Sequence, residues 1–182
     1  AVIDMGANKM ADVVGAVEPE FIGELGPETV GTMVEAMEVG HFVAVGGDQT
    51  VALVETMGLD SVIDLGADKV TGVVTAMDKD NFEVLGADSV VDMAAVMEPT
   101  NLANIGDSAA SGMIEVMPLD DLGALESDKL VGLAVSVAPD TAVTLGPENI
   151  VTMVDNIEPE SIALVGGDTV GGMMAGLPGD DI

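Results

Sequence analysis

Leu65-Gly66-Ala67-Asp68-Lys69-Val70 is the stretch that decides the fold, because it recurs in altered form every twenty residues. Its first position is hydrophobic in nine copies, and the glycine that follows is replaced once, by Glu126. The nine hydrophobic positions are Met5, Leu25, Val45, Leu65, Leu85, Ile105, Leu125, Leu145 and Val165. The copies fit the 182-residue chain without insertion or deletion, so the sequence is a repeat array.

The apolar residues of each unit follow the period of a helix. In the second unit Val30, Met33 and Val34 are spaced by three and four residues, which places them on one face of an α-helix. A shorter apolar pair closes each unit, as Ile22 and Leu25 do in the first. Three residues apart, such a pair fits about two turns of a second helix.

The residues around the repeat glycine are typical of helix ends. Pro27 and Pro147 follow this glycine, where a first-turn proline removes no hydrogen bond. The acidic Glu28 and Glu148 come next and complement the positive end of the helix dipole. We expect the glycine itself, Gly26 in this unit, to end the preceding short helix as a left-handed cap.

The sequence therefore predicts an all-α chain, an α-solenoid of nine 20-residue two-helix repeats. Each unit should hold a helix of about eleven residues and one of about seven, which are marginal alone and must stack on their neighbours. A β-solenoid is the alternative, since twenty residues could form one coil and valine is abundant. The three-four spacing and the first-turn prolines count against it.

A second period of sixty residues lies above the first. Lysine occupies the same unit position at Lys9, Lys69 and Lys129, so the units group into 60-residue triplets. Duplication of a three-unit block is one explanation. The other, which we favour, is that three units complete one superhelical turn, so that each member of a triplet always meets the same neighbours.

The array shows no internal boundary, so we expect residues 1–182 to be a single continuous repeat array. Val2 and Ile182 share one column of the repeat, and neither end carries a polar cap. We therefore expect an excerpt of a longer array. Alternatively, both ends self-associate with further copies head to tail.

The charge of the chain limits its partners. It contains 33 acidic residues against four lysines, a net charge of −29. Such a surface repels nucleic acid and anionic membranes, and no apolar run is long enough for a membrane span. Its self-repulsion predicts tolerance of, or dependence on, salt or divalent cations, which would suit an extracellular or cell-surface location.

No constellation in the sequence indicates catalysis, so we expect no enzyme. His41 is the only histidine, and its column is otherwise mostly polar, which predicts an exposed surface residue. The methionine column could suggest capture of a soft metal, but it shares the helical core face and is better read as core packing. That column contains Met37, Met57, Met77, Met97 and Met117.

Acidic clusters are the remaining candidates for a site. The ranges 78–81, 120–121 and 158–160 are rich in carboxylates, which are ligands that Ca²⁺ prefers, yet none matches a calcium-binding loop. We read them as helix caps and solvated faces with at most weak Ca²⁺ association. The sequence thus names no catalytic, cofactor-binding or metal-binding residue.

The units resemble α-solenoid repeats in general and match no consensus of a common repeat class. The lack of insertions favours a structural role as a rod, stalk or fibre segment. One alternative is a scaffold that binds a protein or peptide along the column Thr29, Gln49, Lys69 and Ser89. Another is an acidic matrix protein buffered by cations.

Overall fold

The computed structural model describes residues 6–178, and all regular structure in this range is helical. The prediction of an all-α chain is confirmed for this range. Because it contains no strand, the β-solenoid alternative is excluded for the same residues. Residues 1–5, which include Met5, and residues 179–182 lie outside the description.

Longer and shorter helices alternate along the described chain. The longer helices, of 9–11 residues, are α1 (Ala7–Ala16), α3 (Pro27–Ala36), α5 (Gly47–Met57), α7 (Ala67–Thr75), α9 (Ala87–Val96), α11 (Asp107–Val116), α13 (Ser127–Ser136), α15 (Pro147–Asn156) and α17 (Gly167–Gly176). The shorter helices, of 4–7 residues, are α2 (Pro19–Glu24), α4 (Val39–Val45), α6 (Leu59–Asp64), α8 (Lys79–Leu85), α10 (Pro99–Leu102), α12 (Leu119–Ala124), α14 (Pro139–Ala142) and α16 (Ile162–Val165).

The repeat glycines have a conformation that differs from the expected left-handed cap. From Gly26 to Gly166 their φ angles lie between 77° and 100°, with ψ between 140° and 169°. This is the mirror-extended region that only glycine adopts readily, whereas a left-handed cap needs ψ near +47°. Glu126, which replaces the glycine once, passes the same junction at φ −60° and ψ 142°.

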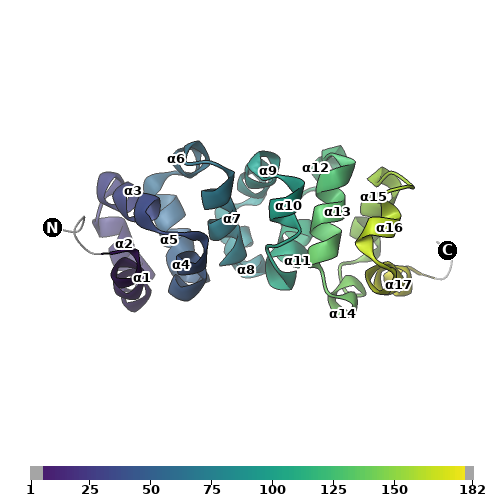
Figure 1. Ribbon diagram of the computed structural model, residues 1–182, viewed down its shortest axis with the longest axis horizontal. Helices are drawn as coiled ribbons and strands as arrows, with labels where there is room; N and C mark the ends of the chain where they lie inside the picture. Colours follow the sequence, from purple (N-terminus) through teal and green to yellow (C-terminus); the bar gives the residue numbers. More distant parts are fainter. Residues whose placement is uncertain (1–5, 179–182) are drawn as a thin grey trace.

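The largest contacts between helices join partners that are three places apart in the chain. Among the largest contacts are α1 with α4, α2 with α5, α4 with α7, α8 with α11, α10 with α13 and α14 with α17. We call three consecutive helices a layer, so that α1–α3 form the first layer and α4–α6 the second. Figure 1 shows the helices following one another along the long axis, with α1 and α17 at opposite ends.

The layers explain the 60-residue period in a way that the sequence did not predict. Helices α1, α4 and α7 begin at residues 7, 39 and 67, so successive layers start 32 and then 28 residues apart, together 60. Because a layer holds three helices and a unit holds two, the same pairing of helices returns only after six helices, or three units. The spatial neighbour is thus reached after three helices, which is one and a half units. That three units complete one superhelical turn stays a prediction.

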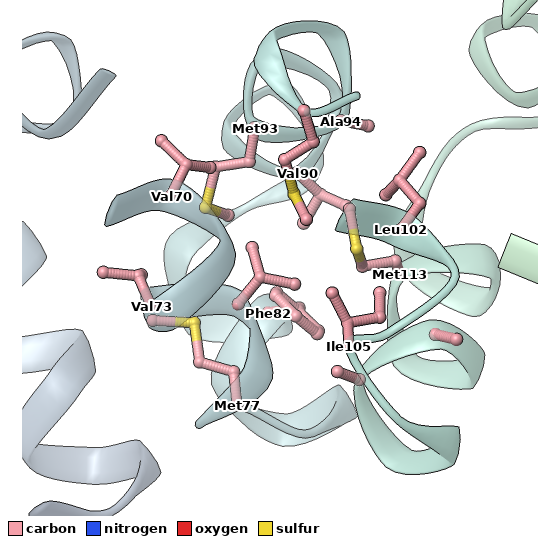
Figure 2. Packing of buried hydrophobic residues seen from close by; sticks show 14 of the residues in the cluster. Val70, Val73, Met77, Phe82, Val90, Met93, Ala94, Leu102, Ile105 and Met113 are labelled. Atoms are coloured by element: carbon pink, nitrogen blue, oxygen red, sulfur yellow. The ribbon is translucent and has the colours of Figure 1, made fainter. Parts of the chain in front are cut away.

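The core is one continuous apolar cluster that runs from Met10 to Met173. Figure 2 shows how its middle part is built: Phe82 of α8 lies among side chains of α7, α9, α10 and α11, which include Met113. Met77, from the connection between α7 and α8, lies beside them. Phe82 has no exposed surface, and Met77 is 2 % exposed. Flexible methionines fill the irregular space around the few aromatic rings.

Close approach between layers depends on small residues at one position of the longer helices. A Cβ added to Gly132 would lie 2.5 Å from the Pro99 carbonyl oxygen, and one added to Gly172 would lie 2.3 Å from that of Pro139. Gly72 and Gly112 meet α4 and α8 in the same way. In the middle unit of each triplet this position holds a larger residue, namely Thr32, Asp92 or Thr152.

None of the helices within residues 6–178 has both the length and the apolar character that crossing a membrane requires.

Candidate functional site

His41 connects the first two layers. Its Nε2 lies 2.8 Å from Oδ1 of Asn8 on α1, and its Nδ1 accepts a hydrogen bond of 2.9 Å from the Glu38 backbone N–H. Accepting at Nδ1 leaves the proton on Nε2, which then donates to Asn8. His41 is therefore a half-buried link between layers, and the prediction of a free surface residue is corrected.

The same position carries a polar link in two further layers. The Asn81 side-chain N–H donates to Oδ1 of Asp48 at 3.0 Å, and only 7 % of Asn81 is exposed. Thr141 donates to Oδ2 of Asp107 at 2.7 Å, and the Ala138 backbone N–H donates to Oδ1 of that carboxylate at 2.7 Å. We call the hydrogen bonds of His41 to Asn8, of Asn81 to Asp48, and of Thr141 and Ala138 to Asp107 the layer ties.

Two lysines of the 60-residue period bind the carboxyl end of an earlier helix. Lys69 donates to the backbone carbonyls of Val34 at 3.1 Å and Glu35 at 2.8 Å, and also to that of Met37. Lys129 donates to the carbonyls of Ala94 at 3.1 Å and Ala95 at 2.6 Å. A cation at this end complements the helix dipole and pairs carbonyls that the helix leaves free.

Burial lowers the pKa of Lys69, while the nearby carboxylates of Glu38 and Glu35 oppose this shift. Lys79 is in the reverse situation on the surface. Its hydrogen bond of 2.7 Å to Oε2 of Glu115, from α8 to α11, raises the pKa of Lys79, and the Glu115 charge adds to the effect. Both lysines therefore join one layer to another.

The methionine column and the acidic ranges, the remaining candidates from the sequence, lie in the core or at helix ends. Met37, Met77, Met97 and Met117 are buried in the core, and Met57 packs against it half-buried, which confirms core packing for this column. Asp78 in the acidic range 78–81 accepts a hydrogen bond of 3.1 Å from the Asn81 backbone N–H as a helix cap. Asp120 and Asp121 lie in the first turn of α12. In the range 158–160 the Glu158 backbone N–H donates to Oγ of Ser127 at 2.9 Å.

Within residues 6–178 no three histidine or acidic side chains are grouped so that they could hold a metal ion. Weak Ca²⁺ association stays a prediction from charge alone.

The variable column that the scaffold alternative would use for binding makes contacts within the fold at several positions. Thr29 and Gln49 are half-buried, Lys69 caps α3, and Ser89 donates to the Leu85 carbonyl at 2.8 Å. The later member Thr169 donates to the Val137 carbonyl at 3.4 Å, across to the previous layers. Lys69 and Thr169 of this column therefore bind other parts of the fold, whereas Thr29 lines an apolar hollow on the first layer.

An apolar hollow of ≈ 420 Å³ lies on the first layer, between α1, α2 and α3. Its lining includes Val13, Phe21, Leu25 and Met33. Phe21 and Val13 are 52 % and 44 % exposed. Phe21 stands in the column that carries the polar layer-tie residues elsewhere, so the first layer presents an aromatic ring where later layers present a hydrogen-bonding group.

Sequence reasoning missed the layer ties because it treated the column of His41 as solvent-exposed. A usable signal was present, since Glu38 and His41, or Asp78 and Asn81, form a capping box at the start of a short helix. The box was visible as a local motif, but its partner 33 residues earlier was not.

No protein-family model, no curated protein and no solved structure matches this chain.

Proposed function

We propose that the chain is an α-solenoid of nine two-helix units that serves as a structural element, a rod, stalk or fibre segment at the cell surface or in the extracellular space. The observation that carries the proposal is the use of its polar side chains. His41, Asn81, Thr141, Lys69 and Lys129 all bind another layer. Groups that a binding protein would present to a ligand here hold layers together: His41, Asn81 and Thr141 bind the preceding layer. The two lysines bind the layer before the preceding one.

The packing supports the same proposal. Each layer contacts the next through helices that are three places apart in the chain, and one apolar cluster continues through all the layers. An array of this kind resists bending because every junction buries apolar surface and adds hydrogen bonds of about 1 kcal/mol each. The outward carboxylates, part of a net charge of −29, favour a surface that stays soluble and repels like surfaces.

Small-angle X-ray scattering of the purified chain tests the shape. We expect an elongated monomer whose longest dimension stays the same between about 0.1 M and about 1 M NaCl, over which the Debye length falls from about 10 Å to about 3 Å. A compact particle would contradict the rod.

Electron microscopy of the source material, with an antibody raised against the chain, tests the location. We expect label on filaments or surface stalks, and a diffuse label inside cells would contradict the proposal. A scaffold for a protein or peptide stays the alternative, and it predicts saturable binding of a partner that the rod does not require.

A further inference from the structure

A hollow of ≈ 370 Å³ is formed by α2, α5 and α8, the middle helices of three successive layers. Val84 of α8 lines this hollow and is 63 % exposed, and Val51 of α5 lines it and is 6 % exposed. The carboxylates of Glu20, Asp48 and Glu55 line the same hollow. It therefore combines apolar surface with negative charge, and we call it the α5 groove.

The equivalent place sixty residues later is occupied by a lysine of the chain itself. Lys79 and Glu115 stand where Pro19 and Glu55 stand in the α5 groove. The Lys79 ammonium lies 2.7 Å from Oε2 of Glu115, and Glu115 is half-buried. At this position of the repeat the fold therefore accommodates a cation beside the carboxylate.

Glu55 keeps the carboxylate without the lysine. Pro19 carries no charge, and within residues 6–178 no amino group lies within ion-pair distance of Glu55, which is exposed. In the third copy of the pair, Pro139 and Ala175, the lysine and the carboxylate are both absent. The packing of α17 at that place thus proceeds without an acidic side chain, so the fold itself gives Glu55 no partner and no evident task.

We propose that the α5 groove binds a lysine- or arginine-bearing segment of another protein, with the cationic group beside Glu55 and an apolar neighbour on Val84. The partner supplies the cation that Lys79 supplies to Glu115 within the chain. The two further carboxylates of the groove attract the same charge, and the exposed valine offers apolar surface to cover. A second copy of this chain is a poor occupant, because each copy has a net charge of −29.

The inference goes beyond the structural role, because it depends only on the local arrangement of α2, α5 and α8. Its failure and that of the proposed function can be told apart. A compact particle in solution would remove the rod and leave the groove, whereas loss of binding at the groove would leave the rod intact.

NMR titration of the chain with labelled methyl groups tests the proposal. The probe is the capped peptide acetyl-Leu-Lys-Val-Lys-Leu-amide, and its control has both lysines acetylated. We expect saturable shifts of the Val84 and Val51 methyl signals at about 0.1 M NaCl, and weaker binding at about 1 M because salt screens the charges. The acetylated peptide should bind about fivefold more weakly or less, since it brings no cation to Glu55.

Substitutions locate the contact. Glu55→Gln should weaken binding of the peptide about fivefold. The matched control is Asp155→Asn, which removes an exposed carboxylate at the same unit position on α15, outside the groove, and should change binding by less than about twofold. Pro19→Lys should block the groove with an ion pair to Glu55 like that of Lys79, whereas the uncharged Pro19→Gln should not. Circular dichroism confirms that the variants are folded.

Three results would overturn the proposal. Equal weakening by Glu55→Gln and Asp155→Asn would show diffuse attraction to an acidic surface. Shifts that do not saturate or that miss Val84 would place the peptide elsewhere. Unchanged binding by Pro19→Lys, or of the acetylated peptide, would show that no cation is held beside Glu55.

Discussion

At the scale of the residue, the repeat glycines with positive φ hold a backbone conformation that no other residue adopts without strain. Gly106 has φ +88° and ψ 162°, and a Cβ placed there would meet no atom within 4 Å. Any penalty for a side chain at this position therefore comes from the backbone conformation alone. Gly6 stands at the equivalent place in the first unit with φ −57°, which any residue adopts.

We expect Gly106→Ala to lower the free energy of unfolding by about 1–3 kcal/mol, because alanine is strained in this region of φ and ψ. Gly6→Ala should leave it within about 0.5 kcal/mol. Urea unfolding followed by circular dichroism measures both. Equal effects of the two substitutions would show that conformation is not the reason for the glycine.

Lys69 provides a prediction that depends on pH. Its folded-state pKa lies below the ordinary value of 10.5, because burial opposes the charged form more than Glu38 and Glu35 favour it. The unfolded chain then binds the Lys69 proton more tightly, so the contribution of Lys69 to stability rises as pH rises from its folded pKa to 10.5. NMR titration of the side-chain methylene next to its amino group should show a midpoint below 10.5. A midpoint at or above that value would contradict the shift.

At the scale of the element, the distance between stacked helices is set by one small residue in the longer helix. In α17 this residue is Gly172, whose neighbour Gly171 faces open space. Both glycines lie inside the same helix, so they differ only in what surrounds them.

We expect Gly172→Ala to lower the free energy of unfolding by about 1–3 kcal/mol, because α14 and α17 must move apart to admit the methyl group. Gly171→Ala should raise it by up to about 1 kcal/mol, since alanine favours the helix. Thermal unfolding of the two variants compares them. Should Gly172→Ala be neutral, the close contact with the Pro139 carbonyl would not control the spacing.

The helices could be predicted from sequence because their signals are local. The spacing of Val30, Met33 and Val34 and the proline at position 27 lie within one turn or two of each other. The stacking partner could not be predicted, because a 20-residue repeat does not fix how many helices make a layer. Asn81 could be recognised as part of a cap, but its bond to Asp48 follows only from three helices in a layer. The 60-residue spacing of Lys9, Lys69 and Lys129 could be seen in the sequence. The contact of Lys69 and Lys129 with the end of an earlier helix could not be predicted from it.

At the scale of the whole molecule, the pairing between layers restricts how the chain can be shortened. Deleting residues 61–120 removes three units and brings Gly132 and Lys129 to the places of Gly72 and Lys69. Deleting residues 61–80 removes one unit and brings Asp92 and Ser89 there instead. The second deletion therefore sets an acidic side chain against Phe42 and removes the lysine that caps α3.

We expect the variant that lacks three units to unfold cooperatively and at a higher temperature than the variant that lacks one unit, although its chain is shorter. This order reverses the one expected from chain length, because larger arrays gain more junctions. Thermal unfolding followed by circular dichroism decides between the two. If the unfolding temperature simply followed the number of units retained, the helix pairing that returns every 60 residues would not contribute to stability.

Charge also acts on the whole molecule. With a net charge of −29, raising NaCl from about 0.1 M to about 1 M should raise the midpoint of thermal unfolding, since screening weakens the repulsion within the compact state. Calorimetry at constant pH measures the shift. A midpoint that stays constant or falls would show that self-repulsion does not limit stability.

Three helices to a layer and two to a unit have a consequence for how a gene of this kind changes length. Recombination between neighbouring copies adds or removes one, two or three units with equal ease at the level of DNA. Only changes in steps of sixty codons return every glycine and lysine to a compatible neighbour, so other lengths would fold poorly and be lost. Related genes should therefore differ from this one by whole multiples of three units.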